Sequence, residues 1–255
     1  MKLDKDIQVA VIGGSGLTAL DSFLQLDSHE LETPYGATSA PVIEGILADR
    51  PIFFIARHGV NHTLAPHKIN YRANLWALNQ LGVRQIVSTN AVGGIRKDLQ
   101  AQSIVIPDQL IDYTFKREHS FCADESDNIP HVDFTFPFCN TLRRRIINAA
   151  NSLDMDIADT GVYGCTEGPR LETAAEILRL EKDGCDLVGM TCMPEAVLAR
   201  ELDISYASVC LVVNRAAGKS EQLISMKEIE TCLDEGMKKV FELLQAVVPS
   251  LAHLD

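Results

Sequence analysis

The sequence has little of what marks a membrane protein or a nucleic-acid-binding protein. No apolar run reaches the roughly 18–20 residues that are needed to cross a bilayer. Positive charge is scarce, because 23 Lys and Arg residues stand against 35 Asp and Glu residues, for a formal net charge of −12. An acidic chain argues against a general surface for nucleic acid or anionic membrane, so any recognition of phosphate requires a local site.

Cysteine pairs with the spacing of metal or redox sites are also missing. The seven cysteines are scattered, and none forms a CxxC pair. The first residues, MKLDKDIQVAVIGG, place acidic residues before a short apolar run, which is unlike a signal peptide. An odd number of cysteines in such a chain predicts reduced thiols and a cytoplasmic protein. The simpler interpretation is that the cysteines are small buried hydrophobic residues.

Strand-like and helix-like segments alternate along the chain. Continuous apolar runs, typical of strands covered on both faces, occupy residues 7–14, 41–47, 51–58, 84–94, 103–112, 186–191 and 206–214. Helical spacing occurs at residues 71–82, 142–153, 171–184, 193–203 and 226–247. We expect one α/β domain spanning residues 1–255, with a hairpin where only ADR separates two strands. Ligands of such folds bind at the carboxyl ends of strands.

The first predicted strand ends in Gly13-Gly14-Ser15-Gly16. Glycines let the backbone approach an anion, and the amides with the Ser15 hydroxyl could donate to phosphate. A structural turn and a dinucleotide-binding loop are the alternatives, since Gly14, Gly16 and Ala19 fit GxGxxA. The polar segment 26–36 looks turn-like and does not supply the second strand that a dinucleotide fold requires. The pattern therefore favours a small-anion loop.

Arg57 and His58 end the second strand of the hairpin. An arginine in this position is either a surface charge or a bidentate anion clamp. His58, His62 and His67 suggest a metal site, but their four-residue spacing belongs to helices and Gly59 is a poor helix former. We expect no metal here.

Two further strand ends carry possible anion donors. The small residues of STNAVGG (88–94) expose backbone amides near Ala91, which suits an anion cradle or a turn. Thr191 precedes a helix begun by Pro194 and Glu195, residues that suit a first turn, so its hydroxyl could cap that helix or bind an anion. Sequence spacing alone leaves open whether these groups converge.

Taken together, the motifs resemble the trimeric purine nucleoside phosphorylase and methylthioadenosine phosphorylase family. They are IGGSGL, ARHG...H, INYRANLWALNQLGV, STNAVGGI, TEGPRLETAAEI and VGMTCMPEAVLARELDISYA, in family order from about residue 8 to 245. The resemblance implies a nucleoside phosphorylase-like mixed, partly barrel-like β-sheet flanked by helices, and a homotrimer. It also implies the reaction, in which inorganic phosphate attacks C1′ of a purine nucleoside. Phosphate is then a co-substrate, and no metal or organic cofactor is needed.

The resemblance also implies roles for individual residues. Phosphate binding falls on Ser15, Arg57, His58, the Ala91 backbone and Thr191. Catalysis falls on His58 and Asn214, and substrate binding on Met190, Leu171, Glu172, Asn214, His131, Met226 and Ile229. Met190 would lie under the ribose. His131 would reach the sugar pocket of a neighbouring subunit, the alternative being an ordinary loop histidine.

Two positions bear on the purine base. Methylthioadenosine phosphorylases typically end the last strand in Asp-x-Asp, whereas this chain has Asn214-Arg215-Ala216. The Asn214 amide can donate to O6 of a 6-oxopurine and accept from a protonated N7. Glu172 matches the glutamate that accepts N1–H in 6-oxopurine enzymes. Both residues favour hypoxanthine or guanine over adenine.

The segment EQLISMKEIETCL bears on the 5′ substituent. It lacks the histidine of hydroxyl-specific enzymes, and Met226 and Ile229 align with apolar residues that contact a methylthio group. Alternatively, both side chains pack a helix core. We expect S-methyl-5′-thioinosine as substrate, with S-methyl-5′-thioadenosine or inosine and guanosine as alternatives. A nicotinamide-dependent dehydrogenase and a non-catalytic nucleoside-binding protein are the hypotheses of another class.

Overall fold

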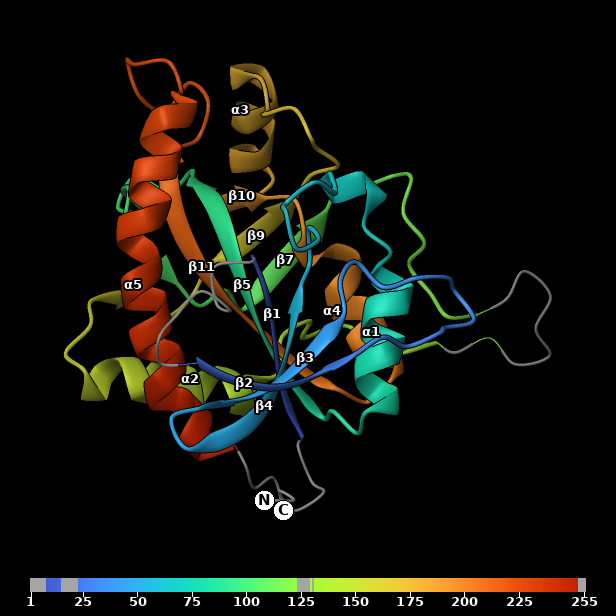
Figure 1. Cartoon of the computed structure of the whole chain (residues 1–255). Coiled ribbons are helices and arrows are strands. Elements are labelled where there is room, and N and C mark those ends of the chain that lie inside the picture. The colour runs from blue at the N-terminus through green and yellow to red at the C-terminus, as the bar shows by residue number, and fades with distance from the viewer. Residues whose placement is uncertain (1–7, 15–22, 123–128, 130, 252–255) are drawn as a thin grey trace.

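A computed structural model describes residues 8–14, 23–122, 129 and 131–251 of the chain (Figure 1). In this part the strands are β1 (Val9–Gly13), β2 (Phe23–His29), β3 (Val42–Leu47), β4 (Arg50–Ala56), β5 (Gln85–Gly94), β6 (Ile104–Val105), β7 (Gln109–Asp112), β8 (Ile157–Ala158), β9 (Val162–Cys165), β10 (Leu187–Gly189) and β11 (Ser205–Arg215). The helices are the short 3-10 turn η2 (Pro66–Lys68), α1 (Tyr71–Gln80), α2 (Asn140–Ser152), α3 (Ala174–Lys182), α4 (Cys192–Glu201) and α5 (Met226–Leu251).

The strands form one mixed sheet that branches at β5. The sheet runs β2-β3-β4-β1-β5-β10-β9-β7, and β11 lies along the other side of β5. β1 runs parallel to both β4 and β5, and β11 runs parallel to β5, so the carboxyl ends of these four strands point the same way. β10 runs antiparallel to the end of β5, with Val188 opposite Gly93. Its carboxyl end therefore turns back along β5 toward Ala91.

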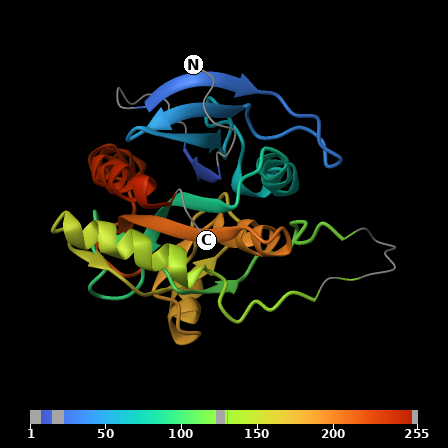
Figure 2. The same ribbon diagram turned by 90° about the horizontal axis from the view of Figure 1, so that it is seen from below.

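Helices cover both faces of the sheet, as the two views show (Figure 1, Figure 2). α1 and α4 contribute Leu75, Leu78 and Leu198 to one apolar core. α2 and α5 contribute Ile146 and Leu244 to a second core on the opposite face. Both faces of β1, β5 and β11 are thereby buried, which explains why these strands are continuous apolar runs. No helix in the described ranges is long and apolar enough to cross a membrane.

The predicted hairpin and helices are present. β3 and β4 pair antiparallel, and the predicted α/β fold with a mixed sheet and flanking helices is confirmed. α3 begins three residues later than the helical pattern. The Thr173 hydroxyl accepts from the Glu176 amide while the Glu176 carboxylate accepts from the Thr173 amide, and this capping box sets the first turn.

Two predictions about strands are wrong. The single strand expected at 103–112 is divided into β6 and β7, because Pro107 between them has no N–H to donate to a ladder. The segment 26–36 is not entirely a turn, since residues 26–29 belong to β2, the edge strand that pairs with β3. An edge strand keeps one side in water, so its polar composition hides it from a hydrophobicity pattern.

Candidate active site

Thr191 is brought beside β5 by the reversed direction of β10. Its hydroxyl donates to the Asn90 side-chain carbonyl at 2.5 Å, and no side-chain cap of α4 forms, so the capping alternative is wrong. Ala91 follows Asn90 and is the one exposed residue in the otherwise buried run of β5. At the end of β1, a Cβ on Gly13 would lie 2.4 Å from the Thr89 hydroxyl, so only glycine fits there. Ser15 lies outside the described residues.

Arg57 is buried rather than displayed on the surface. It is 2 % exposed and forms an ion pair with Glu195, whose Oε2 accepts from Nη2 at 3.0 Å. Other N–H groups of the guanidinium donate to the carbonyls of Thr89 and Ile12. Burial by itself disfavours the charged guanidinium, but the attraction of the Glu195 carboxylate outweighs this and raises the pKa of Arg57 above its ordinary value.

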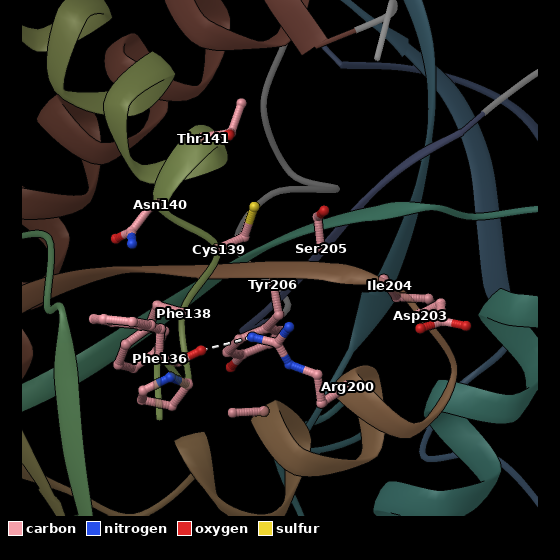
Figure 3. Close-up of a pocket in the computed structure, with 12 residues that line it drawn as sticks. Phe136, Phe138, Cys139, Asn140, Thr141, Arg200, Asp203, Ile204, Ser205 and Tyr206 are labelled. Atoms are coloured by element: carbon pink, nitrogen blue, oxygen red, sulfur yellow. Dashed lines mark hydrogen bonds between the residues drawn. The ribbon is translucent and has the colours of Figure 1, made fainter. Parts of the chain in front are cut away.

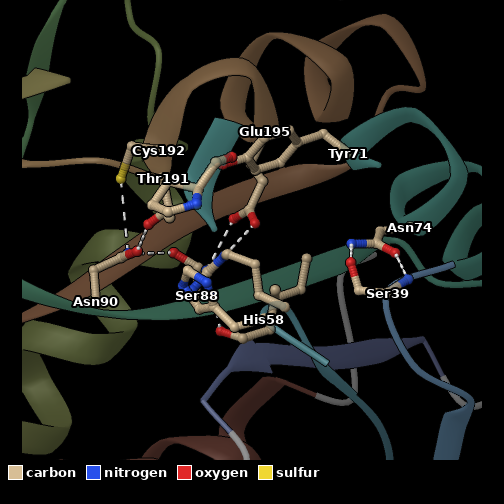
Figure 4. Close-up of polar contacts among 12 residues, drawn as sticks. Ser39, His58, Tyr71, Asn74, Ser88, Asn90, Thr191, Cys192 and Glu195 are labelled. Carbon is tan, nitrogen blue, oxygen red and sulfur yellow. Dashed lines mark hydrogen bonds and ion pairs between the residues drawn. The ribbon is translucent and has the colours of Figure 1, made fainter. Parts of the chain in front are cut away.

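A chain of buried side chains connects Arg57 to Thr191 (Figure 4). The Asn90 amide donates to Ser88 at 2.9 Å and to Ser208 at 2.6 Å. The Tyr206 hydroxyl lies 2.8 Å from Ser88 and donates to Glu195 at 2.9 Å. Burial raises the pKa of Tyr206 and keeps the phenol protonated. Two predicted phosphate residues thus share one network, which is Thr191, Asn90, Ser88, Tyr206, Glu195 and Arg57.

His58 is held by a reciprocal pair of hydrogen bonds with Leu64. The Leu64 amide donates to the His58 carbonyl at 2.9 Å, and His58 Nδ1 lies 2.8 Å from the Leu64 carbonyl. The ring stacks on His62 with 4.5 Å between centroids. Burial, together with the neighbouring Arg57 and His62, lowers the pKa of His58 to about 4. The imidazole is therefore neutral at pH 7.

The three histidines do not form a metal-ligand cluster with one another. Among the described residues, the group with ligand atoms all within 4.8 Å of one another is Asp27, His29 and Glu44, on β2 and β3. It belongs to the exposed edge of the sheet and includes none of the predicted site residues.

Asn214 lies at the carboxyl end of β11, after a register shift between Val212 and Asn214. It is partly buried, and its Nδ2 donates to the Arg215 carbonyl at 2.7 Å. Arg215 itself donates to the carbonyls of Ile95, Arg96 and Leu99. Ala216 is 2 % exposed, so the end of this strand presents an amide and no carboxylate.

Glu172 and Met190 are near the ends of β9 and β10. A Glu172 carboxylate oxygen accepts from the Thr166 hydroxyl at 2.6 Å, which ties it to the residue that follows β9. The Met190 carbonyl accepts from buried Arg117 at 2.7 Å. A Cβ on Gly168 would lie 2.5 Å from the Met190 sulfur, so the φ of +65° and the close approach both require glycine. Leu171 is 40 % exposed.

The remaining predicted substrate residues are more accessible. Met226, the first residue of α5, is 60 % exposed. Ile229 is partly buried and packs on the second core, as the core-packing alternative predicts for it. His131 is exposed in the connection between β7 and α2.

A cavity of about 310 Å³ lies elsewhere, between residues 136–141 and the turn from α4 into β11 (Figure 3). Arg200 lines it and donates to the Phe136 carbonyl at 2.6 Å. Ser205 and Tyr206 place it at the amino end of β11. At about 3.3 Å per residue, this is roughly 25 Å along the strand from Asn214. The cavity contains none of the predicted site residues.

Sequence reasoning missed four polar residues whose side chains are buried in the region of the predicted site, which are Glu195, Tyr206, Asn90 and Arg117. The sequence pattern around Glu195 indicates only an acid suited to the first turn of a helix. A buried arginine requires a counter-ion, and that was the one signal that could have raised the question. Glu195, the partner of Arg57, is 138 residues away in the chain, so only the fold identifies this ion pair.

Comparisons with known proteins place the chain in a family. The model of the Phosphorylase superfamily matches residues 8–249. The chain is 50 % identical, over 94 % of its length and 97 % of the relative's, to a probable S-methyl-5′-thioinosine phosphorylase of Pseudomonas syringae pv. tomato. It is 41 % identical to a 6-oxopurine nucleoside phosphorylase of Pyrococcus furiosus, over 95 % and 92 % of the two chains.

Solved structures extend the similarity to the fold. A methylthioadenosine phosphorylase from an antarctic soil metagenomic library superposes with a TM-score of 0.90 at 35 % identity, covering 98 % of this chain and 88 % of that one. Methylthioadenosine phosphorylase from Schistosoma mansoni, in complex with adenine, gives a TM-score of 0.91 at 31 % identity, with 98 % and 93 % covered.

Proposed function

The chain belongs to the phosphorylase superfamily, and we propose that it is a pentosyltransferase that cleaves S-methyl-5′-thioinosine with inorganic phosphate. The products are hypoxanthine and 5-methylthioribose 1-phosphate, which places the reaction in purine salvage. The probable S-methyl-5′-thioinosine phosphorylases, 46–50 % identical to this chain, support the choice of nucleoside. One family model over residues 8–249 supports a single catalytic domain.

The observation that carries the choice of base is the end of β11. Asn214 presents an amide, and buried Ala216 removes any second acid at this strand end. One N–H of Asn214 donates to Arg215, which leaves the second N–H for O6 of a 6-oxopurine and the carbonyl for a protonated N7. Glu172 supports the same choice, because an ionised carboxylate accepts N1–H.

In the proposed reaction, a phosphate oxygen forms a bond to C1′ while the C1′–N9 bond breaks and its electron pair stays on the purine. The proton of hydrogen phosphate balances the reaction, since the sugar phosphate leaves as a dianion and the base leaves protonated. The enzyme's contribution is to hold the reactants in line and to stabilise the charge on the leaving base. We assign phosphate to Ser15, Arg57, His58, the Ala91 amide and Thr191.

We assign the sugar to Met190, and the 5′ substituent to Met226 and Ile229. An apolar pocket would leave a 5′-hydroxyl without a hydrogen bond, while a methylthio group loses nothing there. The exposure of Met226 in one protomer fits a pocket that another subunit completes. The protein is accordingly proposed to act as a cytoplasmic homotrimer, with His131 reaching the sugar site of its neighbour.

Base release from S-methyl-5′-thioinosine, S-methyl-5′-thioadenosine and inosine, each with and without phosphate, tests this function. We expect phosphate-dependent cleavage with methylthioinosine as the preferred substrate. Preferred cleavage of methylthioadenosine would overturn the choice of base, and preferred cleavage of inosine would overturn the choice of 5′ group. Cleavage that is independent of phosphate would overturn the reaction itself.

A further inference from the structure

The side chain of His58 can donate only from one nitrogen, and that nitrogen is already used. A carbonyl oxygen accepts and never donates, so the 2.8 Å contact with the Leu64 carbonyl requires a proton on Nδ1. The Leu64 amide returns a hydrogen bond to the His58 carbonyl at 2.9 Å, which fixes both residues. A neutral imidazole protonated on Nδ1 has a lone pair, and no hydrogen, on Nε2.

The surroundings of the ring keep it neutral. Arg57 is an adjacent cation and the His62 ring stacks on His58, and both oppose a further positive charge. Glu195, the acid of the network, is already paired with Arg57, because its carboxylate accepts from Nε and Nη2. Within the described residues, Nε2 of His58 has no hydrogen-bond partner. Among these residues it is an acceptor without a donor.

The hydroxyl proton of Thr191 is also already used in a hydrogen bond within the protein. Its only hydroxyl proton goes to Asn90 Oδ1 at 2.5 Å, so the oxygen can offer only lone pairs to a ligand. The Asn90 side chain is held in this orientation, with Oδ1 toward Thr191, because its amide hydrogens donate to Ser88 and Ser208. Two of the side chains assigned to phosphate therefore offer only lone pairs. The single O–H of a hydrogen phosphate dianion can be donated to one of them, whereas an anion without an O–H can donate to neither.

We propose that His58 recognises the proton of hydrogen phosphate, with the phosphate O–H donating to His58 Nε2. This inference rests on the proposed function, which assigns phosphate to this site. The site then selects tetrahedral oxyanions that retain an O–H at neutral pH, such as phosphate and arsenate. It rejects anions of the same shape and charge that have no O–H, such as sulfate and monofluorophosphate.

Anion binding to the full chain, measured by calorimetry at pH 7.5 without nucleoside, tests the proposal. We expect phosphate and arsenate to bind, and sulfate and monofluorophosphate to bind about 100-fold more weakly, because each of the latter displaces water from the Nε2 acceptor of His58 without supplying a donor to it. His58→Lys replaces the acceptor by a donor, and we expect the ratio of the phosphate affinity to the sulfate affinity to fall about tenfold. His62→Gln, at the exposed ring stacked on His58, should leave this ratio of affinities unchanged.

A second measurement needs no substitution. The ¹⁵N shifts and couplings of His58 in the unsubstituted protein should be those of the neutral Nδ1–H tautomer, with or without phosphate. An imidazolium or an Nε2–H tautomer would overturn the proposal, as would sulfate binding within about threefold of phosphate. If phosphate and sulfate bind alike and phosphorolysis still occurs, only this inference fails. If selective phosphate binding occurs without phosphorolysis of any nucleoside, only the proposed reaction fails.

Discussion

The residues that we assign to phosphate (the phosphate side) and those that we assign to the nucleoside (the nucleoside side) have different surroundings. On the phosphate side, Arg57 and Tyr206 are 2 % exposed and Glu195 is not exposed at all. On the nucleoside side, Leu171 is 40 % exposed and Met226 is 60 % exposed. The first region is a closed network of buried charge and hydrogen bonds, and the second is a set of strand ends and a helix start that face outward.

The difference is between residues assigned to phosphate, the co-substrate of the proposed reaction, and residues assigned to one particular nucleoside. An anion site with a fixed arrangement of donors and acceptors must be rigid, and burial makes each hydrogen bond there stronger and each missing partner more costly. Substrate selectivity instead depends on a few contacts that can change without disturbing the core. Substitutions on the phosphate side should therefore alter folding stability, and those on the nucleoside side should alter substrate ratios.

The largest effect is expected for Glu195→Gln. The variant leaves the buried Arg57 cation without its counter-ion, which should lower the free energy of unfolding by about 3–5 kcal/mol. Chemical denaturation measures it. The matched control is Glu176→Gln, which breaks the exposed 2.7 Å pair with Arg170 but keeps a side-chain acceptor for the Thr173 amide, so it should lower the free energy of unfolding far less. Equal losses in the two variants would contradict the importance of the buried pair.

Acid should destabilise the protein through His58. Its pKa of about 4 in the folded protein lies below the ordinary value of 6.5, so the unfolded chain binds the proton more readily. The stabilisation is fully present above about pH 6.5 and is lost as the pH falls toward 4, by up to about 3 kcal/mol. Unfolding of the phosphate-free protein between pH 4 and 7.5 should therefore depend less on pH in His58→Gln. Identical pH dependence in the two proteins would refute this.

On the nucleoside side, Asn214→Asp should change the base preference without a large loss of stability. A carboxylate cannot donate to O6 but accepts from an adenine amino group, so the ratio of 6-oxopurine to 6-aminopurine turnover should fall about 100-fold. Values of kcat/KM for methylthioinosine and methylthioadenosine measure the ratio. Asn151→Asp, at an exposed amide in α2, is the control. An unchanged ratio would mean that Asn214 does not select the base.

The smallest effect is expected at the 5′ group. Met226→Ser should lower the preference for methylthioinosine over inosine by about tenfold, because the pocket loses apolar surface and gains a hydroxyl. Relative kcat/KM values provide the test. Leu223→Ser, at a nearby side chain that is 94 % exposed, should leave the preference unaltered. A preference that survives Met226→Ser would favour the interpretation that Met226 does not contact the substrate.

Local patterns predicted much of the fold. Apolar runs identified β1, β4, β5 and β11, and helical spacing identified α1 and α5, because these elements bury whole faces. β8 and β9 were missed because strands of two and four residues are too short to show a pattern. β2 was missed because it is an edge strand. Its pairing with β3 is decided by the sheet rather than by its own composition.

The order of amino acids is enough to show which chemical groups end the strands. These groups include Arg57, His58, Thr191 and Asn214, and Ala216 shows that a second acid is missing. How those groups are used depends on the three-dimensional fold. The antiparallel course of β10 brings Thr191 to Asn90, and α4 carries Glu195 to an arginine 138 residues away. The Leu64 carbonyl determines which nitrogen of His58 carries the proton. Hydrogen-bond roles depend on which neighbours meet in space, and residue spacing along the chain does not contain that information.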